Sequence, residues 1–167
     1  MLKAILLALM MVALLSIGSR HISLANSLDL SQFQWKNRLL FLFAPNRNHP
    51  LFEPLHKSLA DQKTEAADRD LVIFEILESG PSSMNTNYLD PQAAQKLRDK
   101  FNVQRGRFAV ILLGKDGGIK LNRRDQTQLA DIFTLIDAMP MRREEMRQKS
   151  RIGESDTAAS NKSGGSE

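Results

Sequence analysis

The sequence predicts an α/β domain built on one four-stranded mixed sheet with helices on both faces. Three observations lead to this fold class. Apolar residues fill three short runs, at 38–44, 71–77 and 108–113. Segments with the apolar spacing of helices separate these runs, and an Asp-Gly turn at 116–117 follows the last one. Short apolar runs that alternate with helical segments are typical of a largely parallel sheet covered on both faces.

The three apolar runs are the predicted inner strands. Their sequences are RLLFLFA, LVIFEIL and FAVILL, with apolar side chains at nearly every position. A strand with one face in solvent would alternate between apolar and polar residues, so these strands are expected to be buried on both faces. Residues 119–122 do alternate, and the tight turn at 116–117 makes them an outer strand antiparallel to the third run.

Helices are predicted from Pro50 or Pro54 to about residue 63, at 91–101 and at 126–139. Asp90 is a suitable N-cap for the second helix, because its side chain can accept from free backbone N–H groups. Pro140 ends the third helix, since proline has no N–H to donate. The side chains predicted to face inward are Leu55, Leu59, Ala94, Leu97, Phe101, Leu129, Ile132, Phe133, Ile136 and Met139.

The predicted order of elements is β-α-β-α-β-β-α. Two connections carry helices, so the first three strands are expected to be parallel and joined by right-handed crossovers. Residues 64–70 and 78–88 are expected to be polar connections, and Trp35, in the lead-in segment, is expected to pack on the edge of the core. This three-layer arrangement is the thioredoxin-like one.

Both ends of the chain differ in composition from the domain between them. Residues 1–25 carry Lys3, an apolar run and a small-residue site ending at Ala25, which is the layout of a secretory signal peptide. An uncleaved N-terminal anchor is the alternative. Residues 26–149 form the predicted domain, and 150–167, rich in Ser, Gly, Ala and Asp, a disordered tail. The sequence thus predicts export to the periplasm or outside the cell, with no membrane span after cleavage near Ala25.

Charge and cysteine content exclude several classes of function. The formal net charge is +4, and it falls to +2 (21 basic against 19 acidic residues) without residues 1–25, which hold Lys3 and Arg20 but no acid. That balance lacks the concentrated basic stripe of a nucleic-acid-binding protein. The chain contains no cysteine. Disulfides, thiolate metal sites and thiol redox catalysis are therefore excluded.

Three segments resemble a named family. They are Trp35 with RLLFLFAP at 38–45, RFAVILLGKDGGIKL at 107–121, and LIDAMPMRREEM at 135–146. Together they resemble the domain-of-unknown-function family 4174, also called P-DUDES. The resemblance implies a thioredoxin-like fold and export, and related domains occur in animal extracellular-matrix proteins. The family supplies no accepted catalytic residues to carry over.

The junction between the first strand and helix, residues 45–49, is where thioredoxins and peroxiredoxins carry their reactive cysteine. Here its sequence is PNRNH. Thioredoxins also place a cis-proline before the third strand, and residues 104–107 contain no proline. Both departures indicate that the domain is not a redox enzyme.

An anion site is predicted at this junction. The free N–H groups and the dipole of a helix N-terminus favour a negative ligand. In the thioredoxin-like arrangement residues 104–107 lie beside the junction, so their arginines are expected to converge on it. The alternative is that the arginines are ordinary surface charges and the asparagines are turn residues. The predicted site comprises Asn46, Arg47, Asn48, His49, Arg105 and Arg107.

Two further groups of residues have side chains suited to metal binding or catalysis. His49, Glu53 and His56 have spacing suited to one helix face and to zinc, but Pro50 and Pro54 interrupt that helix, so no metal site is predicted. Ser82 and Ser83 have no histidine nearby in sequence, and approach of His49 or His56 in the fold stays open. The charge runs at 123–125 and 141–149 are expected to be solvated faces with local salt bridges.

The sequence therefore predicts a non-redox binding or interaction module, with an envelope or extracellular protein or an anionic ligand as partner. No cofactor is predicted. The alternative is a non-thiol enzyme, hydrolase-like or antioxidant-related, that uses His49 as a base with or without a metal.

Overall fold

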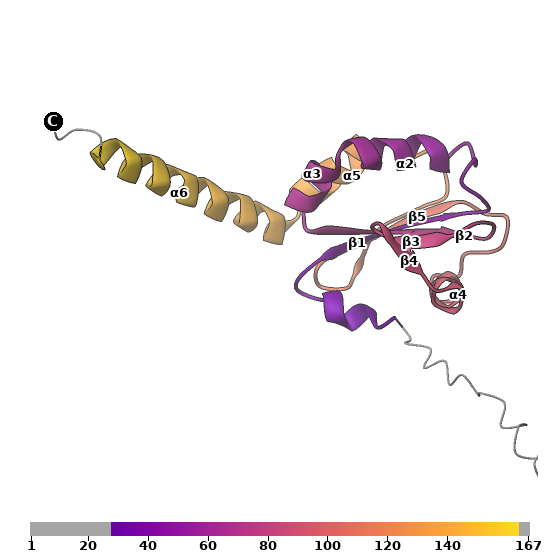
Figure 1. Ribbon diagram of the computed structural model, residues 1–167. Helices are drawn as coiled ribbons and strands as arrows, with labels where there is room; N and C mark the ends of the chain where they lie inside the picture. The colour runs from indigo at the N-terminus through magenta and orange to yellow at the C-terminus, as the bar shows by residue number, and fades with distance from the viewer. Residues whose placement is uncertain (1–27, 164–167) are drawn as a thin grey trace, which may run out of the picture.

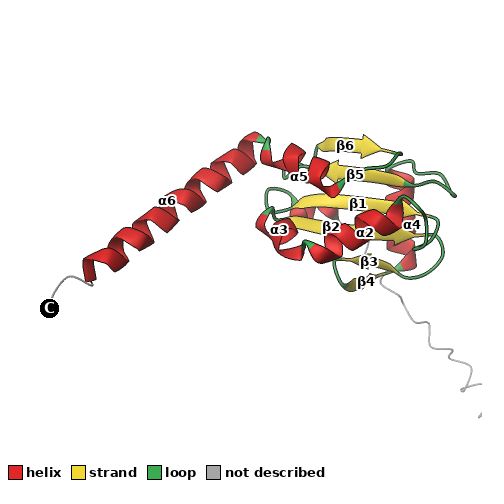
Figure 2. Cartoon of the chain, turned by 90° about the horizontal axis from the view of Figure 1, so that it is seen from above, coloured by secondary structure: helices red, strands yellow, loops and turns green. Residues whose placement is uncertain are grey.

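The computed structural model describes residues 28–163, and the predicted signal peptide lies outside them. Six strands form one sheet in the order β4-β3-β2-β1-β5-β6 (Figures 1 and 2). The strands are β1 (Arg38–Ala44), β2 (Leu71–Leu77), β3 (Ser82–Met84), β4 (Asn87–Leu89), β5 (Ala109–Leu113) and β6 (Ile119–Arg123). The helices are the 3-10 turn η2 (Leu30–Phe33), α2 (Phe52–Asp61), α3 (Lys63–Asp68), α4 (Pro91–Lys100), α5 (Leu129–Asp137) and α6 (Pro140–Ser163).

The sheet separates two apolar cores. α2, α3 and α5 cover one face, and α4 with the η2 segment covers the other (Figure 1). The central strand β1 alternates between them: Leu40 and Leu42 enter the first core, and Phe41 and Phe43 the second. No residue of β1 is more than 3% exposed. This confirms the predicted three-layer fold and the burial of the apolar strands on both faces.

The direction of the third apolar strand was predicted wrongly. β1 and β2 are parallel, but β5 runs antiparallel to β1. The cause is α4, which lies across the strands, so that it is seen end-on in Figure 1. Near its end, Arg98 Nη2 donates to the carbonyls of Ala44 and Ile76, at the carboxyl ends of β1 and β2 (3.4 and 3.1 Å). The chain therefore enters β5 from that end of the sheet.

Two expected loops contain regular structure. Residues 78–88 include the hairpin β3–β4, which raises the strand count from four to six, and residues 64–70 include most of α3. The hairpin turns at Asn85, whose φ is 53° and whose Oδ1 accepts from Ile73 N–H at 2.9 Å. Asparagine tolerates this left-handed conformation, so one residue both turns the hairpin and ties it to β2.

Trp35 does not pack on the core as predicted. Its φ is 65° and its N–H donates to Lys115 O at 2.6 Å, which leaves its side chain largely exposed. The segment packs on the second core through Leu28, Leu30 and Phe33 instead.

Helix α6 begins at Pro140 and projects from the domain (Figure 1). The sequence predicts the stop after α5 and allows a further short helix over 141–149; the observed helix starts at a proline, which is suited to that position. The helix continues to Ser163, through residues for which the sequence predicts a disordered tail. No helix within 28–163 combines the length and the apolar character that crossing a membrane requires.

Buried ion pairs attach α6 to the sheet, where the sequence predicts a solvated charge run. Arg38, at the start of β1 and 1% exposed, pairs with both oxygens of Glu145 (3.1 and 3.2 Å). Glu145 also accepts from Lys115 Nζ at 2.7 Å. Burial raises the pKa of Glu145, but the hydrogen bonds from Arg38 and Lys115 outweigh this effect and leave the pKa below its usual value.

A second group of charges joins α6 to α3. Arg142 is buried and donates to Asp68 and to Asp137 Oδ1, the latter at 3.1 Å. Lys149 also donates to Asp68. These hydrogen bonds, first from Lys149 and then from Arg142, lower the pKa of Asp68 to about 2 from 3.8.

Acid is therefore expected to weaken the attachment of α6. A carboxyl whose pKa is lower in the folded state stabilises the fold above its unfolded pKa, and this contribution is lost as the pH falls through the folded value. Between pH 4 and pH 2 the free energy of unfolding, measured by urea denaturation, should fall more steeply for the wild-type chain than for Asp68→Asn. Because Asp68 is 44% exposed, the difference should be about 1 kcal/mol.

The matched control is Asp125→Asn, which changes an exposed carboxylate. Its pH profile should follow that of the wild type. Identical profiles for Asp68→Asn and the wild type would contradict a role for Asp68 in attaching α6.

Candidate functional site

Glu75 occupies a position in β2 that faces the first core. Leu71 and Leu77 on the same face of the strand are buried among the apolar side chains under α2 and α3, with Ile73 packed against them. The Glu75 side chain is 9% exposed. Burying a carboxylate is costly unless its oxygens are hydrogen-bonded, so the surroundings of Glu75 must supply donors.

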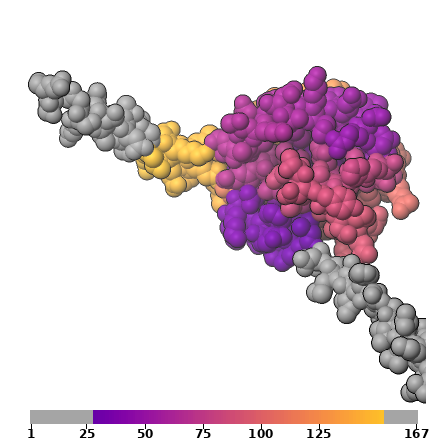
Figure 3. All heavy atoms as spheres, in the orientation of Figure 1, coloured from indigo at the N-terminus to yellow at the C-terminus, as the bar shows by residue number. Residues whose placement is uncertain are grey.

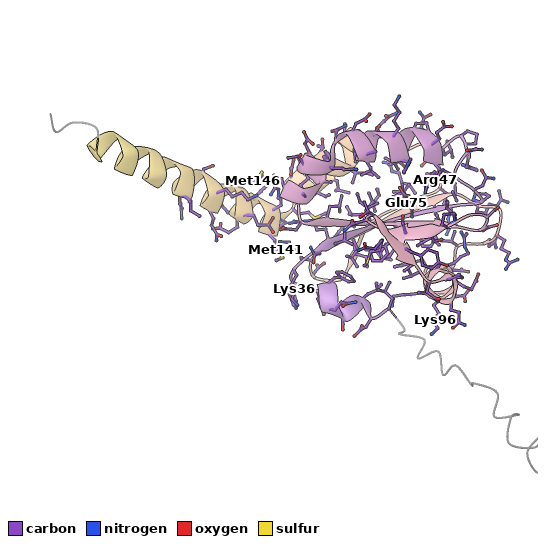
Figure 4. The ribbon with its side chains drawn as sticks, viewed as in Figure 1. Lys36, Arg47, Glu75, Lys96, Met141 and Met146 are labelled. Atoms are coloured by element: carbon purple, nitrogen blue, oxygen red, sulfur yellow. The ribbon has the colours of Figure 1, made fainter. Side chains whose placement is uncertain are left out.

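Three side chains satisfy the carboxylate. Oε1 accepts from His56 Nδ1, and Oε2 accepts from Ser83 Oγ at 3.3 Å. Oε2 also lies 3.5 Å from Arg47 Nη2, as an ion pair. Figure 4 labels Arg47 and Glu75, which lie together between α2 and the sheet. We call Arg47, His56, Glu75 and Ser83 the Glu75 cluster.

The contacts of His56 define its tautomer. Its Nε2 lies 3.0 Å from Arg47 Nη1, and a guanidinium group can only donate. Nε2 is therefore the acceptor, and the proton of the neutral ring is on Nδ1, where it is donated to Glu75. The ring also stacks on Phe52, with centroids 5.6 Å apart. The imidazole is thus held in one orientation.

Each member of the cluster comes from a different element. Arg47 is in the loop after β1, and His56 is in α2. Ser83 is the register partner of Glu75 across the β2–β3 ladder, so strand pairing alone puts its hydroxyl beside the carboxylate. The neighbouring Ser82 is structural: its Oγ accepts from Leu77 N–H at 3.0 Å.

A cavity of about 640 Å³ opens beside this cluster. We call it the Glu75 cavity. α2 and α3 form one wall and the β2–β3–β4 edge forms the other, and these segments border one another on the face shown in Figure 3. The cluster forms its polar end. The apolar wall includes Leu59, Ala66, Ala67, Leu71 and Ile73, and the remaining polar side chains are those of Lys63, Ser82, Asn85, Thr86 and Tyr88.

The cluster is not a serine-nucleophile triad. In such a triad the serine hydroxyl donates to the Nε2 of a histidine whose Nδ1–H points to a carboxylate. Here the Ser83 hydroxyl donates to the carboxylate itself, and Nε2 faces Arg47. The arrangement holds a charged, donor-rich surface at one end of a cavity, which suits binding.

The residues of the anion site predicted from the sequence do not converge. Arg47 turns to Glu75, the buried carboxylate within its reach. His49 and Arg107 line a second cavity of about 510 Å³, where the His49 ring stacks on Phe108. Arg105 lines a third, of about 340 Å³. Asn46 and Asn48 form a turn in which Asn46 Oδ1 accepts from Asn48 N–H at 3.0 Å. Of the three arginines, only Arg107 shares a cavity with His49.

No metal-ligand group forms in the part of the chain whose side chains are described. His49, Glu53 and His56 lie in one region of sequence, but His56 is engaged by Glu75 and His49 accepts from Leu51 N–H at 3.3 Å.

The sequence places Arg47 in the predicted anion site and leaves open an approach of Ser83 to His56, which the fold brings about through Glu75, but Glu75 itself is not among the predicted residues. One feature points to Glu75: it is the single charged residue in the run LVIFEIL. A carboxylate inside a strand that is buried on both faces must have partners, and that requirement marks a candidate site before its partners are known.

The family model for the domain of unknown function DUF4174 matches residues 29–145. The chain belongs to the DUF4174 family. This confirms the resemblance found in the three sequence segments, and the match covers all strands and helices from η2 to α5 with the start of α6.

Several curated proteins are similar to part of this chain. Coiled-coil domain-containing protein 80 of Danio rerio is 24% identical over 140 residues, covering 74% of this chain and 16% of that protein. Sushi repeat-containing protein SRPX2 of Xenopus laevis is 25% identical, covering 71% and 27%, and SRPX of Rattus norvegicus is 27% identical, covering 75% and 28%. The chain therefore spans less than a third of the length of these relatives.

Solved structures similar to this DUF4174 domain include peroxiredoxins. The reduced 2-Cys peroxiredoxin of Plasmodium vivax has a TM-score of 0.53 and 15% identity, covering 69% of this chain and 84% of that one. Thioredoxin peroxidase I of Plasmodium yoelii gives the same TM-score and identity, covering 69% and 79%. At such identity the likeness shows the fold alone, and it confirms the thioredoxin-like prediction.

Replacing Glu75 by leucine is expected to leave the domain folded, with a free energy of unfolding within about 1 kcal/mol of the wild type. Leucine extends the apolar row of β2. The two bases that lose their partner are 46% (Arg47) and 31% (His56) exposed, so water can solvate them. Urea denaturation followed by circular dichroism measures the change.

Glu145→Leu is the matched comparison, since it removes a carboxylate whose partner is fully buried. Leaving Arg38 unpaired should cost about 3 kcal/mol. An equally large loss for Glu75→Leu would show that Glu75 is required for folding and would argue against a site kept for binding.

Proposed function

We propose that this DUF4174 domain is an exported, non-redox binding module and that the Glu75 cavity is its ligand site. Export rests on the signal-peptide pattern of residues 1–25 and implies a periplasmic or extracellular location. The absence of cysteine removes the thiol chemistry that a thioredoxin-like fold otherwise suggests. Binding is the function that the remaining side chains support.

One observation carries the proposal: a fixed polar cluster lies at one end of an open cavity that also has an apolar wall. Small-molecule sites commonly combine apolar walls with a few convergent polar groups that orient the ligand. Folding alone would favour an apolar residue at position 75, within the row Leu71, Ile73 and Leu77. A buried polar residue at a position where an apolar residue would suit the fold better is typical of functional sites.

The size of the domain relative to its relatives also supports a module. The matching regions are 16% to 28% of the length of the animal relatives. A region that makes up so small a part of longer proteins is suited to supplying one self-contained binding function.

Titration with octan-1-ol, followed by amide chemical shifts of the labelled chain, tests whether the cavity accepts a small amphipathic molecule. The shifts should concentrate on the cavity walls, at residues such as Ile73 and Tyr88. Ala67→Trp fills the cavity from an exposed position of α3 and should weaken binding at least tenfold, because the ring takes the space of the ligand.

Ala130→Trp adds the same bulk at an exposed position of α5 outside the cavity and should leave the titration unchanged. Shifts scattered over the surface, or binding that Ala67→Trp does not affect, would overturn the cavity as the ligand site.

A second candidate is a non-thiol hydrolase. The observation in its favour is the contact of His56 Nδ1 with Glu75, which is how a carboxylate orients a histidine base. His49, the base suggested by the sequence, has no such partner: its ring stacks on Phe108, and its Nδ1 accepts from Leu51 N–H. Arg47 occupies the lone pair on His56 Nε2, however, which leaves no free base in this arrangement.

We therefore expect no hydrolysis of p-nitrophenyl octanoate by the wild-type chain beyond that of His56→Ala. Release of p-nitrophenolate measures the rate. An acceleration that His56→Ala abolishes and Arg47→Gln increases would favour the hydrolase over the binding module.

A further inference from the structure

We propose that the Glu75 cavity binds an apolar monocarboxylate, with its carboxylate held by Lys63 and Arg47 and its hydrocarbon part against the α2–α3 wall. The inference rests on the proposed function and adds the chemical class of the ligand. It depends on which hydrogen-bonding groups of the cavity are already satisfied and which are left for a ligand.

The carboxylate and amide oxygens of the side chains that line the cavity already have partners. Glu75 is the only carboxylate among the residues that line it. Its two oxygens already face His56, Ser83 and Arg47. The side-chain oxygen of Asn85 is likewise used, by Ile73 N–H at 2.9 Å. A cationic ligand would have to displace these protein donors from Glu75.

Several hydrogen-bond donors that line the cavity are available to a ligand. Within the described residues Lys63 makes no ion pair, and it lines the cavity from the start of α3. Arg47 is 46% exposed and has five N–H donors, of which the cluster uses only part. The Asn85 amide nitrogen and the hydroxyls of Thr86 and Tyr88 add uncharged groups able to donate. The free groups therefore match a ligand that accepts hydrogen bonds.

The charge balance indicates one negative charge on the ligand. Arg47 and Lys63 contribute +2 and Glu75 contributes −1, while His56 is neutral in the tautomer that Arg47 imposes. One carboxylate brings this total to zero. A dicarboxylate would place its second charge against the apolar wall, where desolvation opposes it.

The wall of the cavity favours an apolar body. Leu59, Leu71 and Ile73 present aliphatic groups, and Ala66 and Ala67 are small enough to leave room beside them. Each methylene buried against such a wall should raise affinity about fourfold. The series hexanoate, octanoate and decanoate should therefore bind progressively more tightly.

The deciding experiment compares three probes of equal chain length on the whole chain: octanoate, octan-1-ol and octyltrimethylammonium. Amide shifts at the cavity walls report binding there and separate it from binding elsewhere. Octanoate should bind at least fivefold more tightly than either of the others. Acetate, which has the carboxylate without the chain, should produce no saturable shift at millimolar concentration.

Lys63→Gln provides the residue-level test, because Lys63 has no part in the Glu75 cluster and its removal leaves that cluster intact. It should weaken octanoate binding about tenfold, the loss expected for a charge-assisted contact, and leave octan-1-ol unaffected. Lys57→Gln removes the same charge from α2 outside the cavity and should change neither.

The outcomes separate this inference from the proposed function. Equal binding of all three probes, a preference for octyltrimethylammonium, or unchanged octanoate binding by Lys63→Gln would overturn the monocarboxylate and leave the cavity as a ligand site. Absence of any saturable shift at the cavity with all three probes would overturn both.

Discussion

The burial of β1 on both faces is the constraint on which the rest of the structure depends. The chain has no disulfide, so apolar packing must hold the domain together. β1 pairs with β2 on one side and with β5 on the other, and it supplies side chains to both cores. Such a strand requires helices above and below the sheet. The three-layer fold follows from this one apolar run.

The same strand determines how α6 is attached. Arg38 begins β1 inside the domain, and a buried guanidinium needs acceptors. Arg69 O accepts from it at 2.9 Å, and Glu145 of α6 supplies the carboxylate. The first turns of α6 are therefore part of the folded domain although the helix is strongly polar. Local sequence suggests only a solvated helix here, because Arg38, which pairs with Glu145, and Asp68, which pairs with Arg142, lie 107 and 74 residues away.

Sequence reasoning succeeded where structure depends on local pattern. The predicted bounds of β1 and β2 agree with the structure, and Asp90 caps α4 by accepting from Gln92 N–H at 2.8 Å. The predictions were wrong or incomplete where the structure depends on contacts between segments far apart in the sequence. The direction of β5 depends on how α4 crosses the sheet, and the β3–β4 hairpin consists of two three-residue strands without an apolar run. Strands this short form because β2 offers an edge to pair with.

The candidate site shows the same division. A lone carboxylate in LVIFEIL is visible in the sequence, but its partners come from the β1–α2 loop, from α2 and from β3, and only folding brings them together. Arg47 belongs to the junction where related folds carry a reactive cysteine, yet its guanidinium is directed to Glu75 rather than to residues 104–107. A buried carboxylate draws a nearby arginine more strongly than solvent does, because the uncompensated charge would be costly.

Because Arg47 is directed to Glu75, the polar groups of the proposed site lie beside β2 and β3 rather than at the β1–α2 junction. A thiol site needs one activated atom at the end of a strand, whereas a binding site needs area and several oriented groups. In the proposed ligand site, the area would come from the α2–α3 wall and the β3–β4 hairpin, and the orientation from the Glu75 cluster. The β3–β4 hairpin therefore does more than extend the edge of the sheet. It carries Ser83 and Tyr88, and it forms the second wall of the cavity.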